Sequence, residues 1–281
     1  MSTIEERAKE ASLNRLWTHT VGIVNSIRTV GYDPITKRPG DTEEPGTGCA
    51  VRWGDHYFIL TAKHVVEKAQ PGDLRIFCRP SGGFEYRTSA DLREQDIVDA
   101  VPMIEQKAVI HRCEWEDLAL MTTIPKAVGP NVEFFDIAND WTDPSEGEVV
   151  HCFGFPSDNG QMVEKRMVGN REERTVALYS TVFSAPVLPL PTEDELKFKI
   201  TGFDPDRHYL VPYEDASKGK HPRGISGAAM WWESDEKQIV WRPNFEFAGV
   251  CTACYRGGTV VQVVKASVVR RFLEEIFGPA A

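Results

Sequence analysis

One serine stands between two glycines, directly before an apolar run, in the stretch His221-Pro222-Arg223-Gly224-Ile225-Ser226-Gly227-Ala228-Ala229-Met230-Trp231-Trp232. The glycines favour a turn, and the run that starts at Ala228 is typical of a buried strand. A serine in such a turn is a candidate nucleophile, although glycine and serine also gather in ordinary turns. Ser226 therefore needs a base and an acid elsewhere in the chain to support that interpretation.

Two upstream segments supply a histidine and an aspartate next to apolar strands. Thr61-Ala62-Lys63-His64 follows the apolar run Tyr57-Phe58-Ile59-Leu60, and Asp117-Leu118-Ala119-Leu120-Met121 begins another. Taken singly, His64 is an ordinary structural histidine and Asp117 an ordinary strand cap. Their joint occurrence with Ser226, in the order His, Asp, Ser, predicts a catalytic triad.

This order and these contexts resemble the trypsin/chymotrypsin-like serine proteases of the PA clan, and among them the intracellular bacterial-type peptidases. In that family Leu-Thr-Ala-x-His carries the base, Asp-Leu-Ala-Leu the acid and Gly-x-Ser-Gly the nucleophile. The order differs from that of α/β-hydrolases and of subtilisins. The resemblance implies an all-β fold of two Greek-key six-stranded β-barrels, with a helix after the second barrel.

The predicted chemistry assigns a role to each residue. His64 removes the proton of Ser226 and later returns it to the leaving amine, while Asp117 orients the imidazole. The backbone N–H groups of Gly224 and Ser226 are the expected oxyanion donors. By alignment to the family, Lys220 would form the floor of the substrate pocket. The residues that would form one of its walls are Thr252, Ala253 and Cys254.

A lysine at the pocket floor would favour an acidic substrate side chain, whereas a shifted loop register would leave Lys220 in solvent. Three departures from the family pattern also bear on activity. Ile225 stands where secreted members have an aspartate that pairs with a new N-terminus, so activation by N-terminal insertion is not expected. Ala228 and Lys63 replace commoner residues and leave an inactive member of the family as an alternative.

Composition limits the partners. The chain has 281 residues, a formal net charge of −10 and a pI near 5.3, which argues against general binding to nucleic acid or to an anionic membrane. It contains neither a secretory signal nor an apolar run of membrane-spanning length, so we expect a cytoplasmic protein. No cofactor is expected.

The six cysteines are expected to be reduced, because Val65 stands where secreted family members have a disulfide cysteine after the histidine. Cys251 and Cys254 have the spacing of half a zinc site or of a redox pair. No second half lies near them in the sequence, which favours structural or pocket-wall cysteines over a metal site.

The remaining pattern predicts two halves, residues 1–137 with His64 and Asp117 and residues 138–281 with Ser226, joined through residues 134–148. An insertion is expected around residues 157–200, where Pro186 excludes a central strand. Residues 32–46 are expected to be an exposed loop. Helices are expected at residues 4–16 and at 267–277, the second capped by Ser267. The expected strands are residues 21–30, 48–53, 57–60, 74–79, 84–88, 108–112, 148–155, 247–252 and 260–264.

The sequence thus predicts a serine endopeptidase that makes a regulated cut in a protein or peptide substrate. Two alternatives stay open. In the first, the chain is a catalytically silent pseudoprotease that serves as a protein-binding module; in the second, it is a latent enzyme that a protein partner activates.

Overall fold

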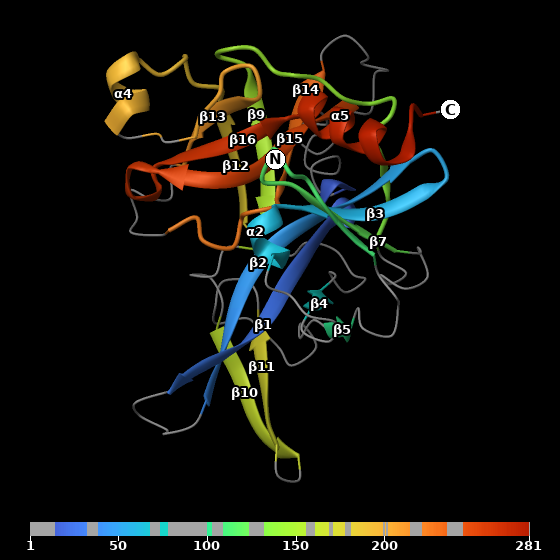
Figure 1. The fold of residues 1–281 in the computed structure, drawn as a ribbon, viewed down its shortest axis with the longest axis vertical. Helices are drawn as coiled ribbons and strands as arrows, with labels where there is room; N and C mark the ends of the chain where they lie inside the picture. The colour runs from blue at the N-terminus through green and yellow to red at the C-terminus, as the bar shows by residue number, and fades with distance from the viewer. Residues whose placement is uncertain are drawn as a thin grey trace, which may run out of the picture.

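The computed structural model describes residues 15–32, 39–67, 74–77, 100–102, 109–123, 132–155, 161–168, 171–177, 181–198, 200, 202–213, 221–234 and 244–280. In these ranges the chain is mostly β, with two large, predominantly antiparallel sheets and a separate two-stranded one (Figure 1). None of the helices described is long and apolar enough to cross a membrane.

The first sheet has eight strands in the order β5-β4-β1-β2-β3-β7-β6, with β8 paired in parallel to β2. All of its strands precede residue 137. Their bounds are β1 Thr20–Tyr32, β2 Pro39–Trp53, β3 His56–Thr61, β4 Leu74–Phe77, β5 Ala100–Pro102, β6 Ile110–Arg112, β7 Ala119–Thr122 and β8 Phe135–Asp136.

The second sheet has six antiparallel strands in the order β12-β9-β14-β15-β16-β13. Their bounds are β9 Val149–Gly154, β12 Thr181–Pro186, β13 His208–Pro212, β14 Ala229–Ser234, β15 Asn244–Tyr255 and β16 Val260–Lys265. The sheet curls so that its two edges approach each other. The N–H of Leu188, just after the edge strand β12, donates to Leu210 O in the opposite edge strand β13 at 2.8 Å.

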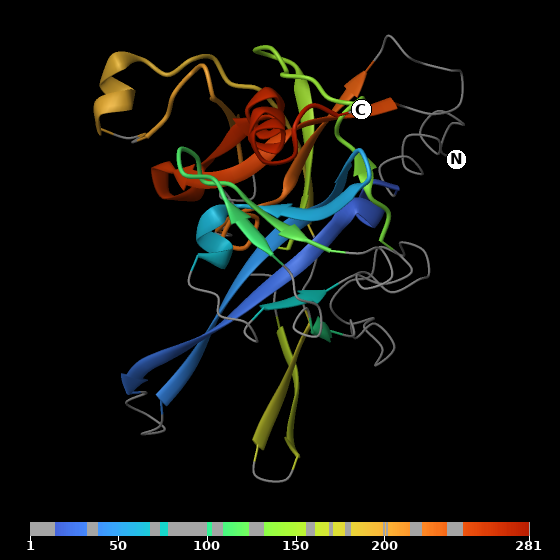
Figure 2. The ribbon, with the colours of Figure 1, turned by 45° about the vertical axis from the view of Figure 1, so that its right-hand side comes forward.

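The strands β10 Gln161–Val168 and β11 Arg171–Ala177 pair only with each other. Their hairpin projects away from the body, in the same general direction as the far ends of β1 and β2 (Figures 1 and 2). The helical elements are short except the last. They are η1 Trp17–His19, α2 Lys63–Val66, α4 Glu193–Phe198, η6 Arg256–Gly258 and α5 Ala266–Phe277.

Alternate residues of the central strands face two different cores, as the two-residue period of a strand dictates. In β3, Ile59 packs inside the first sheet, whereas Phe58 and Leu60 enter a core shared with the second sheet. Trp231 of β14 and Phe272 of α5 belong to the same shared core. Each fully buried aromatic side chain contributes roughly 1.5–3 kcal/mol, so this core fixes the two sheets against each other.

Several expectations are confirmed. The hairpin of β2 and β3 turns at Gly54 and Asp55 and leads directly to the helix that carries His64. Pro186 lies in an edge strand, where its missing N–H breaks no ladder. The C-terminal helix is present as α5. The architecture is mostly β with a curled sheet, and closure into two six-stranded barrels stays a prediction, as does the division into two domains at residue 137.

Two expectations were wrong. Residues 39–46 are not a loop but the first half of β2, paired with β1 from Tyr32 opposite Pro39 to Ile23 opposite Gly46. Ser267 does not cap α5 with its side chain. Its backbone N–H instead donates to Asp143 Oδ1 at 3.0 Å. The helix expected at 4–16 and the strand expected at 84–88 lie almost entirely or entirely outside the described residues.

Candidate active site

His64 and Asp117 meet at one edge of the first sheet. Strands β3 and β7 are antiparallel neighbours with Thr61 opposite Ala119, so the residue groups just after β3 and just before β7 come together. His64 Nδ1 lies 2.6 Å from Asp117 Oδ2, and the backbone N–H of His64 donates to Oδ1 at 2.9 Å. Because a carboxylate only accepts hydrogen bonds, this pair favours the tautomer with the proton on Nδ1, which makes Nε2 the acceptor nitrogen of the ring.

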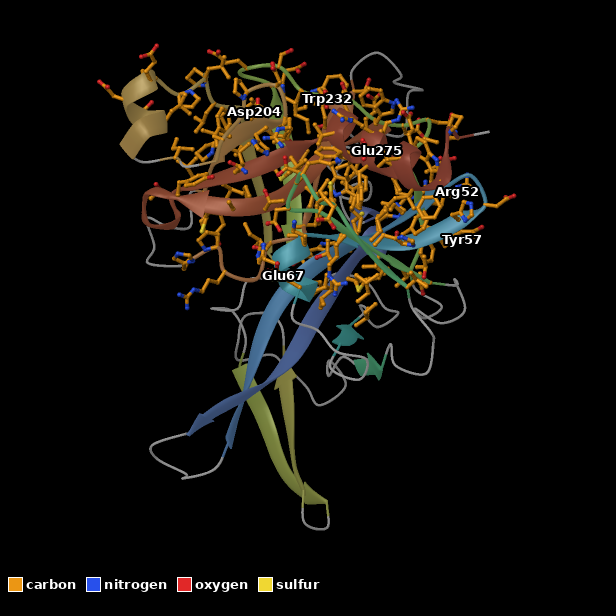
Figure 3. All side chains as sticks on the ribbon, in the orientation of Figure 1. Arg52, Tyr57, Glu67, Asp204, Trp232 and Glu275 are labelled. Atoms are coloured by element: carbon orange, nitrogen blue, oxygen red, sulfur yellow. The ribbon has the colours of Figure 1, made fainter. Side chains whose placement is uncertain are left out.

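The pair is partly open to solvent, as a reacting group must be. The side chain of His64 is 47% exposed and that of Asp117 is 31% exposed. The helix that carries the histidine, α2, has only four residues and ends before Glu67, which Figure 3 labels. The Lys63 N–H donates to Asp117 O at 3.2 Å, so both the backbone and the side chain of the aspartate hold this short helix.

Ser226 lies in a tight loop that leads into β14. Ala228 N–H donates to Ile225 O at 2.8 Å, and Gly227 N–H donates to Cys251 O in β15 at 2.7 Å. Gly224 and Gly227 have φ angles of +92° and +88°, in the left-handed region that favours glycine. The glycines of the motif are therefore required by the backbone path of this loop, which we call the nucleophile loop (residues 222–228).

The nucleophile loop lies against the first sheet close to His64. A Cβ atom added to Gly227 would lie 2.2 Å from Thr61 Oγ1 and 3.0 Å from Ala62 N. Thr61 and Ala62 directly precede the segment that carries His64. The structure thus places the Ser226 loop of the second sheet beside the two residues that precede the helix with His64.

Two backbone donors in the nucleophile loop have no partner in the described part of the chain. Ile225 N–H donates to Pro222 O at 3.2 Å, whereas the N–H groups on either side of it, of Gly224 and Ser226, donate to no described acceptor. These are the two groups that the sequence assigns to the oxyanion hole. A pair of N–H groups without a described acceptor, one of them on the candidate nucleophile, suits a developing negative charge.

The residues expected to line a substrate pocket are placed only in part. Thr252, Ala253 and Cys254 follow Cys251 in β15, beside the nucleophile loop, and they are buried, half-buried and exposed in that order. Burial raises the pKa of the Cys254 thiol, and the nearby positive charge of Arg223 opposes that shift. Lys220 lies outside the described residues.

The described cysteines are free thiols, and Cys78 lies outside the described residues. Cys251 is buried with its Sγ 3.8 Å from that of Cys152, whereas Cys254 is exposed. The two cysteines of the Cys-x-x-Cys spacing therefore lie in different environments. In the part of the chain that the structure describes, no three His, Cys, Asp or Glu side chains gather as metal ligands would.

Glu116, which no sequence pattern singled out, holds the backbone of Asp117 through a hydrogen bond. Its Oε1 accepts the Asp117 N–H at 3.0 Å, and its Oε2 lies 3.0 Å from His208 Nε2 and 3.2 Å from a guanidinium nitrogen of Arg207. Asp204, labelled in Figure 3, donates its N–H to His208 Nδ1 at 2.9 Å, so Nε2 carries the proton that bonds to Glu116.

Burial raises the pKa of Glu116, but the hydrogen bonds from His208 and from the Asp117 N–H, together with the charge of Arg207, outweigh it and hold that pKa below its ordinary value. Only the position of Glu116 next to a candidate triad acid could have drawn attention to it.

Thr47 was also missed. Its N–H donates to Ser226 O at 2.8 Å, and its one sequence signal is the pair of flanking glycines.

No protein-family model matches this chain, and no curated protein matches it.

Proposed function

We propose that this protein is a serine endopeptidase of the trypsin/chymotrypsin-like type, with Ser226 as the nucleophile, His64 as the general base and Asp117 as its orienting acid. One observation carries the proposal. The Asp117 carboxylate holds both the ring and the backbone of His64, at 2.6 and 2.9 Å, beside the glycine-bounded loop of Ser226. The mostly β architecture with a C-terminal helix is compatible with that family.

In the first half of the reaction, Ser226 Oγ bonds to the carbonyl carbon of the substrate peptide while its proton passes to His64 Nε2. The carbonyl electron pair moves to oxygen, and the resulting oxyanion accepts hydrogen bonds from Gly224 and Ser226 N–H. When that pair returns, the C–N bond breaks. The leaving amine takes the proton from His64, and an acyl ester remains on Ser226.

In the second half, water replaces the amine. His64 takes a proton from the water as its oxygen attacks the ester carbon, and the same two N–H groups hold the new oxyanion. Collapse releases the carboxylic acid, and the proton on His64 returns to Ser226 Oγ. Asp117 remains ionised throughout and stabilises the imidazolium that forms in each half.

The proposed setting is the cytoplasm, and the proposed target is a protein or peptide, cut under the control of a protein partner. The buried thiols Cys49, Cys113, Cys152 and Cys251 suit a reducing compartment. The absence from this sequence of the aspartate used in activation by N-terminal insertion favours control by a partner over control by propeptide removal.

The test is labelling of the purified protein with a fluorophosphonate probe, which reports an activated serine without a known substrate. We expect labelling of the wild type and its loss in Ser226→Ala and in His64→Ala. Ser184→Ala is the matched control, because Ser184 is an exposed residue whose hydroxyl lies 2.7 Å from His151 Nδ1, so this serine also has a histidine partner.

Labelling that persists in Ser226→Ala and disappears in Ser184→Ala would assign the activated serine elsewhere and refute the proposal. A folded wild type that takes no label would contradict an enzyme that is active alone. Labelling that then appears with a candidate partner protein would identify a latent enzyme, and its continued absence would favour a silent binding module.

A further inference from the structure

Thr47, in β2, is fully buried, and all of its polar groups are used at the junction of the two sheets. Its N–H donates to Ser226 O at 2.8 Å, and its hydroxyl donates to Gly224 O at 2.7 Å. The hydroxyl also accepts the N–H of Phe155, next to β9, at 3.0 Å. Its carbonyl accepts the Thr61 hydroxyl at 2.7 Å.

Two of these bonds hold the nucleophile loop directly after each of its two unused N–H groups. The carbonyls of Gly224 and Ser226 point to Thr47, while the N–H groups of the same two residues have no described acceptor. A peptide unit is planar, so fixing a carbonyl fixes the plane that joins it to the next residue. The Thr47 contacts therefore restrict the Gly224–Ile225 and Ser226–Gly227 peptide units, each directly after one of the two expected oxyanion donors.

Gly224 needs such a restraint more than another residue would. Its φ is +92°, and glycine has access to many other backbone conformations from there. Within the described residues, the only hydrogen bond that Gly224 makes is the one that its carbonyl accepts from the Thr47 hydroxyl. Without that bond, the peptide unit that joins Gly224 to Ile225 is held, among the described residues, only by the longer bond from Ile225 N–H to Pro222 O at 3.2 Å.

We propose that Thr47 is a positioning residue, whose buried hydroxyl fixes the Gly224 carbonyl and thereby keeps the Gly224 and Ser226 N–H groups directed at the reacting oxygen. The inference rests on the proposed serine chemistry. It adds a contribution from the first sheet to the oxyanion site of the second, through a residue that touches neither substrate nor the reacting atoms.

The test compares two substitutions of similar size. Thr47→Val keeps the shape of the side chain and removes the hydroxyl, whereas Thr47→Ser keeps the hydroxyl and removes a methyl group. The readout is the fluorophosphonate labelling of intact protein, separated into the affinity for the probe and the maximal labelling rate. A misplaced oxyanion donor lowers the maximal rate, because that interaction strengthens only in the transition state.

We expect Thr47→Val to lower the maximal labelling rate about 100-fold, as loss of one oxyanion donor does, with little change in probe affinity. Thr47→Ser should label within a few-fold of the wild type. Thr20→Val is the control for general damage. It removes another buried threonine hydroxyl, which donates to Leu16 O at 3.3 Å in the first sheet and does not contact the nucleophile loop.

All variants are compared well below their unfolding temperatures, so that a loss of stability does not enter the rate. The inference is overturned if folded Thr47→Val labels as fast as the wild type, or if Thr47→Ser and Thr20→Val are slowed as much as Thr47→Val. A folded wild type that takes no label, alone or with a partner protein, would overturn the proposed function, whereas a wild type that labels beside an equally fast Thr47→Val would overturn this inference alone.

Discussion

Gly227 illustrates how a single residue sets the distance between the two sheets at the site. It has a φ of +88°, and an added Cβ would lie 2.0 Å from Thr47 O and 2.2 Å from Thr61 Oγ1. Gly227→Ala therefore meets both a backbone penalty and a steric clash. We expect it to lower the free energy of unfolding by roughly 3–5 kcal/mol and to abolish fluorophosphonate labelling.

Gly54→Ala separates the two contributions. Gly54, in the turn at the other end of β3, has a φ of +57° but no atom within 4 Å of the added Cβ. Gly54→Ala should lower the free energy of unfolding by only about 1 kcal/mol, which is the backbone penalty alone, and leave labelling intact. Urea unfolding measures both values. Equal costs would mean that Gly227 is needed for its backbone angle and not for the close contact of the sheets.

Asp117→Asn tests the orientation of the histidine. The amide oxygen still accepts the His64 N–H, but the amide nitrogen is a donor and now faces Nδ1, so it selects the tautomer with the proton on Nε2. That tautomer has no acceptor for the serine proton. We expect the second-order labelling rate to fall about 10⁴-fold, with the thermal midpoint nearly unchanged. A loss of less than tenfold would exclude Asp117 as the orienting acid.

The candidate site residues that the sequence singles out are those with a distinctive local pattern. His64, Asp117 and Ser226 each stand in a recognisable motif next to an apolar strand. Thr47 and Glu116 do not, because their roles depend on contacts with Gly224 and His208, far away in the chain. A hydrogen bond between distant residues leaves no trace in the local sequence.

Among the elements, α5 depends on a residue outside it. Its N-terminal N–H groups need acceptors, and Asp143 Oδ1 accepts from Ser267 N–H at 3.0 Å. We expect Asp143→Ala to lower the free energy of unfolding by about 1 kcal/mol and Asp143→Asn, which keeps an acceptor, by about half of that. Urea unfolding at low salt checks both. If Asn proves as costly as Ala, the charge of Asp143 matters and its hydrogen bond does not.

Elements with strong periodicity were predictable, and those stabilised by pairing alone were not. The apolar faces of β3 and α5 show in the sequence, as Phe58 and Leu60 or Val269 and Phe272. The first half of β2, from Pro39 to Gly46, has the proline, glycine and acidic residues of a loop. It is a strand because β1 supplies the partner for its backbone N–H and C=O groups, which a local reading does not include.

At the scale of the whole molecule, the proposed site depends on the two sheets being fixed to each other. Phe58 and Leu120 of the first sheet pack in one core with Trp231 and Phe247 of the second. At the edge of that junction, Glu116 of the first sheet bonds to His208 of the second through a carboxylate that is only 8% exposed. Stability of the junction and placement of Asp117 are thus linked through one buried charge.

This link predicts a dependence of stability on pH. The pKa of Glu116 in the folded chain lies below its ordinary value of 4.5, so the folded state favours the ionised form. The resulting stabilisation is complete above about pH 4.5 and is lost as the pH falls through the folded-state pKa. Glu116→Gln turns an amide donor toward His208 and Arg207. It should cost about 2–3 kcal/mol at neutral pH, and less as the pH falls below the ordinary value.

Urea unfolding of the wild type and of Glu116→Gln, from neutral pH down to the acid range, measures this difference. Glu114→Gln, at an exposed position two residues earlier, controls for the loss of one negative charge. A difference between Glu116→Gln and wild type that stays constant with pH would show that the carboxylate charge contributes nothing at this junction. A difference that narrows in acid, together with a lower labelling rate at neutral pH, would show that one buried carboxylate both joins the sheets and steadies the Asp117 backbone.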